Sequence, residues 1–218
     1  NITIEYYSDE TGYTEDIPSA AGEYIVHIIV AEGDNYAATE TLFSDDWKFT
    51  IKKANPDYII PIGLTAIYGE TLADIELPDG FVWIISPDTS VGNAGKNTFM
   101  ASYIPEDTTN YVVEDNIEIT VDVAKAIPKV SVDIPDVEYT EGDPLPALIG
   151  ILPDVYEGVF KWITELANGL IAGENELEWQ FTPDDTDNYE IVTGTAIINA
   201  QTTTTTSSTT TSPTTETT

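Results

Sequence analysis

Cysteine and arginine are both absent from this chain of 218 residues. Without cysteine there is no disulfide framework, no thiolate metal site and no cysteine nucleophile. Without arginine, only 7 lysines oppose 39 aspartates and glutamates, so the formal net charge is −32 at pH 7. A chain this acidic repels the phosphates of nucleic acids and anionic membrane surfaces. We therefore expect no nucleic-acid partner.

Long apolar runs and catalytic motifs are missing as well. No run approaches the roughly 18 apolar residues that a membrane-spanning helix needs, so we expect no membrane insertion. No serine stands in a Gly-x-Ser-x-Gly turn, and no glycine-rich loop precedes a helical pattern. The single histidine, His27, lies in the strand-like stretch YIVHIIV, where we expect a packed or surface position. We therefore predict neither an enzyme nor a cofactor.

A repeat of about 75 residues organises what is present. Ala-Gly pairs begin at positions 21, 94 and 172, and Asn-Tyr pairs begin at positions 35, 110 and 188. A period of this length suits small domains in tandem rather than a solenoid. We predict a first repeat over 1–53, a second over 54–126 and a third over 127–200. The joints fall near Ala54 and Ala126, in short connectors that contain lysine and proline.

The second and third repeats share an earlier half that the first repeat lacks. In both, a strand pattern, a glycine-containing turn and a leucine-rich stretch lead to an aromatic pair that ends at Trp83 or Trp162. The chain opens at Asn1 without an initiator methionine or a signal-peptide pattern. We therefore expect a piece of a longer protein with a truncated first repeat.

Strand patterns fill each repeat, as short stretches of β-branched and aromatic residues bounded by Gly, Pro, Asn or Asp. The best helical candidate, 160–171, is weakened by Gly169 and by β-branched residues. The predicted fold class is therefore all-β, as tandem β-sandwich domains. The predicted strands come in pairs, namely 23–32 with 47–53, 97–105 with 117–125, and 175–183 with 194–200.

One loop sequence occurs three times, as FTPDDTDNYE at 181–190, YIPEDTTNYV at 103–112 and AEGDNYAA at 31–38. Proline ends a strand, and Asp and Asn bond to their own backbone, so the string predicts a hairpin turn that every repeat needs. The alternative is a calcium site, with Asp184, Asp185 and Asp187 as oxygen ligands. Because the loop lacks the Asp-x-Asp-x-Asp-Gly spacing, we favour the turn and predict no metal.

The chain resembles a known family in the stretches AAGEYIVHIIVAEGDNYAA, IKKA, YGETLADIELPDG and ITVDVAKA. They are similar to the tandem immunoglobulin-like repeats of bacterial surface and secreted proteins, often called MBG or YDG repeats. The resemblance covers about residues 1–200 and implies an immunoglobulin-like β-sandwich used as a spacer or stalk, without catalytic residues. The AGEY at 21–24 is also similar to the tyrosine corner of immunoglobulin folds, although Asn97 and Asn175 replace Tyr24 in the later repeats.

Aromatic residues supply the main alternative function, carbohydrate binding, because sugars stack on exposed rings. The candidate residues are Trp47, Trp83 and Trp162. Trp83 and Trp162 occupy matching places in two repeats, which favours the core, whereas Trp47 has no counterpart and is the candidate for exposure. The stretch EYYSDETGYTED at 5–16 offers Tyr6, Tyr7 and Tyr13 as a second contact patch, against the simpler reading of a strand and a loop.

The tail over 202–218 contains twelve threonines, three serines, one proline and one glutamate. It has nothing apolar to bury, so we predict a disordered linker over 201–218. Such linkers resemble those that join modules in secreted polysaccharide-degrading systems of Firmicutes, including cellulosomes. We therefore expect an extracellular or cell-surface spacer whose partners are further modules of the same polypeptide. The alternative is a carbohydrate-binding or adhesin module that contacts a polysaccharide or a surface protein.

Overall fold

The computed structural model describes residues 1–39, 41–153 and 156–203. In this part of the chain the regular structure consists of β-strands and two short 3-10 helices, η1 (Asp45–Trp47) and η2 (Leu72–Asp74), with no α-helix. The all-β prediction is therefore confirmed. The predicted linker over 201–218 lies outside the described residues from position 204 onward, and Gln201 still belongs to the last strand.

The chain divides into two compact units. The first unit contains residues 1–66 and 70–123, and the second contains residues 67–69 together with the chain from residue 124 onward. The described residues form three four-stranded sheets and one two-stranded sheet. Each predicted repeat contains one of the four-stranded sheets, while the domain boundaries proposed from the sequence stay a prediction.

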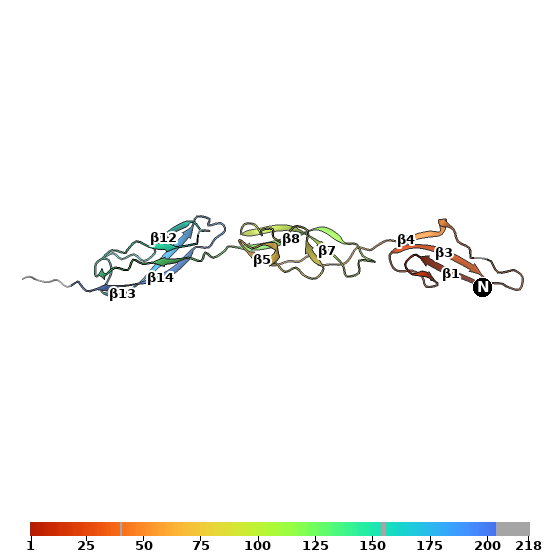
Figure 1. Ribbon diagram of the computed structural model, residues 1–218, viewed down its shortest axis with the longest axis horizontal. Coiled ribbons are helices and arrows are strands. Elements are labelled where there is room, and N and C mark those ends of the chain that lie inside the picture. The colour runs from red at the N-terminus through yellow and green to blue at the C-terminus, as the bar shows by residue number, and fades with distance from the viewer. Residues whose placement is uncertain (40, 154–155, 204–218) are drawn as a thin grey trace, which may run out of the picture. The chain divides into compact units, whose positions relative to one another are not determined.

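The sheet of the first repeat has the order β2-β1-β3-β4. Its strands are β1 (Ile2–Ser8), β2 (Gly12–Thr14), β3 (Gly22–Val30) and β4 (Lys48–Ile51), shown in red to orange in Figure 1. All neighbours in this sheet are antiparallel. The hairpin of β1 and β2 places the Tyr7 and Tyr13 rings side by side, where the sequence predicted a strand followed by a loop.

The sheet of the second repeat has the order β5-β8-β7-β6. Its strands are β5 (Leu64–Ile67), β6 (Phe81–Trp83), β7 (Gly95–Tyr103) and β8 (Glu114–Ala124). Strand β8 alternates exactly as a half-buried strand should, with every second residue from position 117 to 123 buried. The strands predicted over 97–105 and 117–125 are thus confirmed within three residues.

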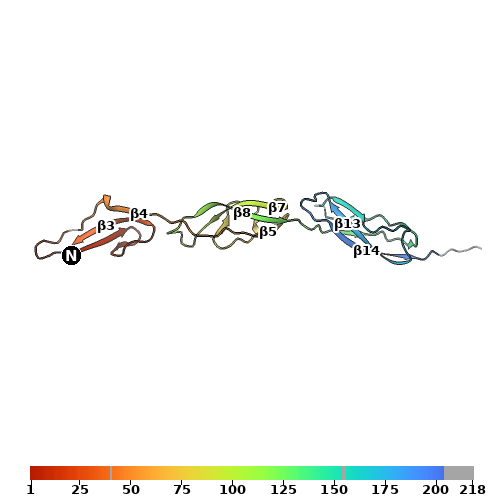
Figure 2. The ribbon, with the colours of Figure 1, turned by 180° about the vertical axis from the view of Figure 1, so that it is seen from behind.

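The sheet of the third repeat has the order β10-β14-β13-β12. It is built from β10 (Tyr139–Thr140), β12 (Gly158–Trp162), β13 (Gly173–Pro183) and β14 (Val192–Gln201). The long β13 and β14 are antiparallel, as the turn between them requires (Figure 2). The short β10 instead pairs with the end of β14 in parallel, a contact that no local sequence pattern indicates.

A second, smaller sheet accompanies the third repeat. It pairs β9 (Ser131–Asp133) with β11 (Ile149–Ile151) in antiparallel register. Gly150 lies where an added Cβ would collide with the ring of Phe160. Glycine at this position therefore lets β11 approach the four-stranded sheet closely.

The three four-stranded sheets share one register. Trp83 of β6 pairs with Ala101, and Trp162 of β12 pairs with Trp179. Counting from the glycines at 22, 95 and 173, the matching pair of the first repeat is Ile4 with Ile28. Strand β1 therefore takes the place of β6 and β12. The expectation that the first repeat lacks the whole earlier half is wrong for its last strand, because the sequence near Ile4 has no tryptophan to mark it.

The cores of the later repeats lie between the long strands of each sheet and the residues that precede those strands in the chain. In the second repeat the buried cluster packs against Tyr58, Leu64 and Leu77. In the third repeat the corresponding partners are Ile134, Tyr139 and Leu145. Fully burying one leucine, isoleucine or phenylalanine side chain of these clusters contributes about 1.5–3 kcal/mol. The buried residues of the two clusters are Phe81, Ala101, Ile117 and Ile119 in one, and Leu170, Leu177, Ile198 and Ala200 in the other.

One hydrogen bond recurs two residues after the glycine of each Ala-Gly pair. The Tyr24 hydroxyl donates to the Ala20 carbonyl at 3.0 Å. The side-chain amide of Asn97 donates to the Asn93 carbonyl at 2.7 Å. Asn175 does the same to the carbonyl of residue 171 at 2.9 Å. All three bonds span four residues, so tyrosine and asparagine perform the same local task at equivalent places.

Candidate functional site

The loop between the two long strands of the third repeat is a hydrogen-bonded turn. The backbone N–H of Asn188 donates to one carboxylate oxygen of Asp185 at 3.2 Å, and its side-chain amide donates to the other at 2.9 Å. Asn188 is buried, while Asp185 is exposed. Both oxygens of Asp185 therefore serve the turn itself, which is the reading favoured from the sequence.

The second repeat contains the same turn at equivalent positions. The Asp107 carboxylate accepts the backbone N–H groups of Thr109 and Asn110 and the side-chain amide of Asn110. These donors favour the charged form of the carboxyl, so they hold the pKa of Asp107 below its ordinary value, the Asn110 amide having the largest effect.

The first repeat closes the equivalent turn with a different set of hydrogen bonds. Here Gly33 and Tyr36 exchange backbone hydrogen bonds at 3.0 and 3.3 Å, which closes a tight turn around Asp34 and Asn35. The segment after it does not lead directly into a strand, because β4 begins only at Lys48. The expectation of one shared hairpin in all three repeats is therefore correct for the second and third and wrong for the first.

The turn also holds the connector at the start of its own repeat. In the second repeat, Ala54 donates to the Asn110 carbonyl at 2.8 Å and accepts from Val112 at 3.0 Å, and Lys53 Nζ donates to the Thr108 carbonyl at 2.7 Å. We call this set the connector–turn contact.

The third repeat repeats the connector–turn contact bond for bond. Ala126 donates to the Asn188 carbonyl at 2.9 Å and accepts from Glu190 at 2.9 Å. Lys125 Nζ donates to the Thr186 carbonyl at 2.6 Å. The repeated Asp-x-x-Asn-Tyr string and the repeated Lys-Ala of the connectors are thus two sides of one structural contact.

The predicted calcium candidates are exposed on the same turn. Asp184, Asp185 and Asp187 all have exposed side chains. Across residues 1–39, 41–153 and 156–203, no three or more His, Cys, Asp or Glu side chains form a group suited to a metal ion. The equivalent turn of the second repeat offers Glu106 and Asp107 in the same places.

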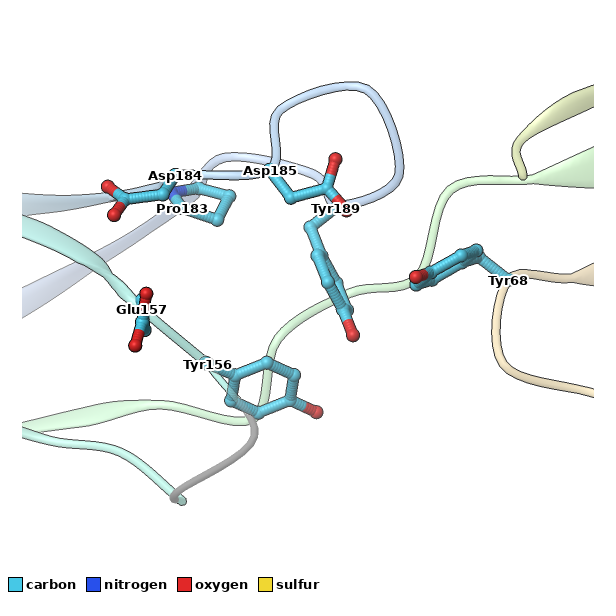
Figure 3. Close-up of a pocket in the computed structure, with 7 residues that line it drawn as sticks. All are labelled: Tyr68, Tyr156, Glu157, Pro183, Asp184, Asp185 and Tyr189. Atoms are coloured by element: carbon cyan, nitrogen blue, oxygen red, sulfur yellow. The ribbon is translucent and has the colours of Figure 1, made fainter. Parts of the chain in front are cut away.

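A pocket of about 310 Å³ opens beside this turn in the second unit. The Tyr189 ring lies between those of Tyr68 and Tyr156, with centroids 5.2 and 5.3 Å away and ring planes at 85° and 84° (Figure 3). Such edge-to-face packing is favourable for aromatic rings. The remaining lining residues are Glu157, Pro183, Asp184 and Asp185.

The pocket combines aromatic faces with negative charge. Burial is the main cause that raises the pKa of the Tyr189 hydroxyl, and Tyr68, Tyr156 and Asp185 add to it. The Asp184 backbone N–H donates to the Glu157 carbonyl at 2.9 Å, which ties the end of β13 to the residue before β12. Tyrosine rings and carboxylates suit a sugar or a cationic group chemically. Neither Tyr68 nor Tyr156 was selected from the sequence: Tyr68 opens the repeated YGETLADIELPDG stretch, Tyr156 lies outside the quoted repeat strings, and no pattern brings the two together.

The three candidate tryptophans fall into two groups. Trp83 and Trp162 are half-buried and pack against the cores of their repeats. Trp162 Nε1 donates to the Pro146 carbonyl at 2.8 Å, while Trp83 Nε1 is buried without a hydrogen-bond partner in the described part of the chain. Trp47 is 40% exposed. These positions agree with the core interpretation for Trp83 and Trp162.

An aromatic group surrounds the single histidine in the first repeat. His27 is buried, and its ring stacks on Phe43 at 5.2 Å and meets Tyr13 edge-on at 4.9 Å. His27 Nδ1 has no hydrogen-bond partner among the described residues. This is the packed strand position expected from the sequence, with the exposed Tyr13 and Phe43 rings around it.

Comparison with known proteins adds no relative. No family model, no curated protein and no solved structure matches the chain. A search of the described residues also found no helix that is long and apolar enough to cross a membrane.

Proposed function

We propose that this chain is a non-catalytic extracellular spacer of a modular bacterial surface or secreted protein, and that it presents neighbouring modules. The observation that carries the proposal is the connector–turn contact, which occurs in the same form at Ala54 and at Ala126. A chain whose repeated motif fastens each connector to the repeat that follows is suited to setting a spacing. The polar groups of the motif make hydrogen bonds within the chain, both in the turn and to the connector.

The same proposal includes the fold of the repeats as immunoglobulin-like β-sandwiches. It is supported by the shared four-stranded sheets, by the cores beneath them and by the tyrosine-corner bond of Tyr24. In the first unit, the Ala21 backbone N–H also donates to the Asn110 side chain at 2.7 Å. This bond joins the first repeat to the turn of the second, beside the connector.

A spin-label experiment tests whether the connector–turn contact fixes a spacing. The chain has no cysteine, so Thr50→Cys and Thr120→Cys introduce two unique label sites on exposed strand residues of the first unit. We expect a single narrow distance distribution in the full chain. Ala54→Pro deletes the donor to Asn110 and should broaden it, whereas Ala54→Gly keeps the donor. A broad distribution in the parent pair would contradict the spacer.

The pocket beside Tyr189 favours a second candidate, a carbohydrate-binding or adhesin module. Half-buried rings with carboxylates beside them are a surface on which a sugar could stack and hydrogen-bond. The test is affinity electrophoresis of the full chain through gels that contain starch, xylan, soluble cellulose derivatives or mucin. Retardation that Tyr156→Leu removes and Tyr36→Leu retains would support this candidate. Trp47→Ala in the same gels tests the exposed tryptophan.

A further inference from the structure

In its described residues, 1–39 and 41–53, the first repeat has the sheet of the later repeats but not the layer that covers it. The shared register identifies the side of this sheet that corresponds to the buried side of the later sheets. On that side Phe49 of β4 is equivalent to Val121 of β8 and to Ile198 of β14. Phe49 is 37% exposed, while Val121 and Ile198 are exposed by 0% and 2%. We call this side the open face, and it consists of Ile2, Ile4, Tyr6, Tyr24, Val26, Ile28, Val30, Phe49 and Ile51, of which Tyr24 is buried against Phe49.

The neighbouring strand shows the same contrast. Ile2 of β1 takes the place of Phe81 of β6, because Ile2 pairs with Val30 as Phe81 pairs with Tyr103. Ile2 is 70% exposed and Phe81 is 8% exposed. The sequence in the first repeat is therefore patterned for burial on a side where the described residues supply no second layer.

Trp47 belongs to this comparison. Trp47 stands two residues before Phe49, and Ile119 stands two residues before the equivalent Val121. Ile119 is fully buried. No tryptophan stands at this position in the later repeats. The exposure expected for Trp47 from the sequence accompanies the absence of a covering layer among the described residues.

The outer edge of the sheet is open as well. In the later repeats the closing strand is flanked on its outer side, β8 by β5 and β14 by the parallel β10. In the described part of the first repeat, β4 pairs only with β3. An unpaired strand edge beside an apolar face is the arrangement that accepts a further strand.

We propose that the open face and the β4 edge bind a half-repeat polypeptide segment of the pattern of residues 54–80, joined ahead of β1. The second repeat of the chain supplies the pattern of this occupant. Residues 54–80 stand directly before β6, and their Tyr58, Leu64 and Leu77 cover the face that corresponds to the open one. The partner therefore has one strand for the edge of β4 and leucine or aromatic side chains over Phe49 and Ile4.

A fusion of the full chain tests the proposal. Residues 54–80 are placed ahead of Ile2, so that Gly80 of the added copy replaces Asn1. The two positions are equivalent, because the Asn1 carbonyl accepts from the Ala31 N–H in the first repeat, as the Gly80 carbonyl accepts from the Ile104 N–H in the second. Ile4→Cys then reports on the open face and Thr50→Cys on the opposite face, because the parent has no cysteine. We expect thiol modification of Cys at position 4 to slow by about tenfold or more, as for a group that reacts only on local opening. The rate at position 50 should not change.

A matched fusion separates specific covering from mere attachment. It carries Leu72→Asp and Leu77→Asp in the added copy, which removes the apolar contacts and keeps the length. This fusion should restore the fast rate at position 4. If both fusions slow the reaction equally, or neither does, the proposal fails.

Two further measurements test the proposal, one if the fusion does not fold and one if the parent chain self-associates. If the fusion does not fold, the free peptide of residues 54–80 is added to the Ile4→Cys chain, and slowing must rise with peptide concentration. No slowing at millimolar peptide overturns the proposal. Sedimentation of the parent chain identifies the other occupant, since a dimer in which position 4 already reacts slowly means that a second copy covers the open face.

Discussion

Asn188 donates both its backbone N–H and its side-chain amide to the carboxylate of Asp185, and its own carbonyl accepts from Ala126. One residue thus orders the turn and receives the connector. We expect Asn188→Ala to lower the free energy of unfolding of the third repeat by about 1–2 kcal/mol, because the hydrogen bond from its buried side-chain amide to the Asp185 carboxylate is lost.

This loss is measured by hydrogen exchange of the β13 and β14 amides in the full chain. The control is Thr195→Ala, which changes an exposed side chain of β14. Unchanged protection in Asn188→Ala would show that the turn is not a stabilising element.

The pKa of Asp107 provides a pH-dependent readout of the same turn. Because the folded state holds this pKa below its ordinary value, the stabilisation is complete above the unfolded pKa and is lost as pH falls through the folded pKa. We expect a carboxyl ¹³C titration to show Asp107 titrating below the ordinary range of an aspartate. In Asn110→Ala, which removes the largest cause, the pKa of Asp107 should move back up. An equal pKa in parent and variant would contradict the hydrogen-bond assignment.

Gly194 faces Trp179 across the β13–β14 ladder, and an added Cβ would collide with the indole ring. We expect Gly194→Ala to destabilise the third repeat by about 1–3 kcal/mol, because the well-packed ring must move. Urea unfolding followed by tryptophan fluorescence measures the effect, with Thr193→Ala as a neighbouring control. A neutral result would mean that the ring can shift without loss.

Salt should stabilise the protein. The charge is −32, and the described residues contain only two ion pairs, Lys48 with Asp45 and Lys96 with Asp122, both exposed. Screening therefore relieves more repulsion than it removes attraction. We expect the unfolding midpoint to rise steadily as sodium chloride increases at pH 7. A fall with salt would indicate that the few ion pairs dominate.

Calcium should act only as a general cation. The Asp185 oxygens already accept hydrogen bonds from Asn188, so calcium and magnesium at equal ionic strength should raise the unfolding midpoint equally. A calcium-specific rise that Asp187→Asn removes would instead establish a metal site at Asp184, Asp185 and Asp187.

The sequence predicted the strands and the turn well, because both depend on local chemistry. Alternation fixes the buried side of β8, and Asp and Asn fix the turn at Asp185. The parallel pairing of Tyr139 with Ala200 was not predictable, since it joins residues far apart without a periodic signal. The pocket was missed for the same reason, because Tyr68, Tyr156 and Tyr189 meet only through tertiary structure. Trp47 was expected to be exposed and is 40% exposed, but the absence of a covering layer could not be read from the pattern around it.

The parallel pairing of β10 with the end of β14 has a mechanical consequence. Tyr139 lies near the start of the third repeat and Ala200 near its end, and the adjoining Glu141 N–H donates to the Gln201 carbonyl at 2.8 Å. When the two ends of this repeat are pulled apart, parallel strands slide along each other, so their hydrogen bonds are loaded in shear and together. Antiparallel terminal strands would open like a zipper, one bond at a time. The parallel pairing of its terminal strands therefore suits the third repeat to bearing tension between its two ends.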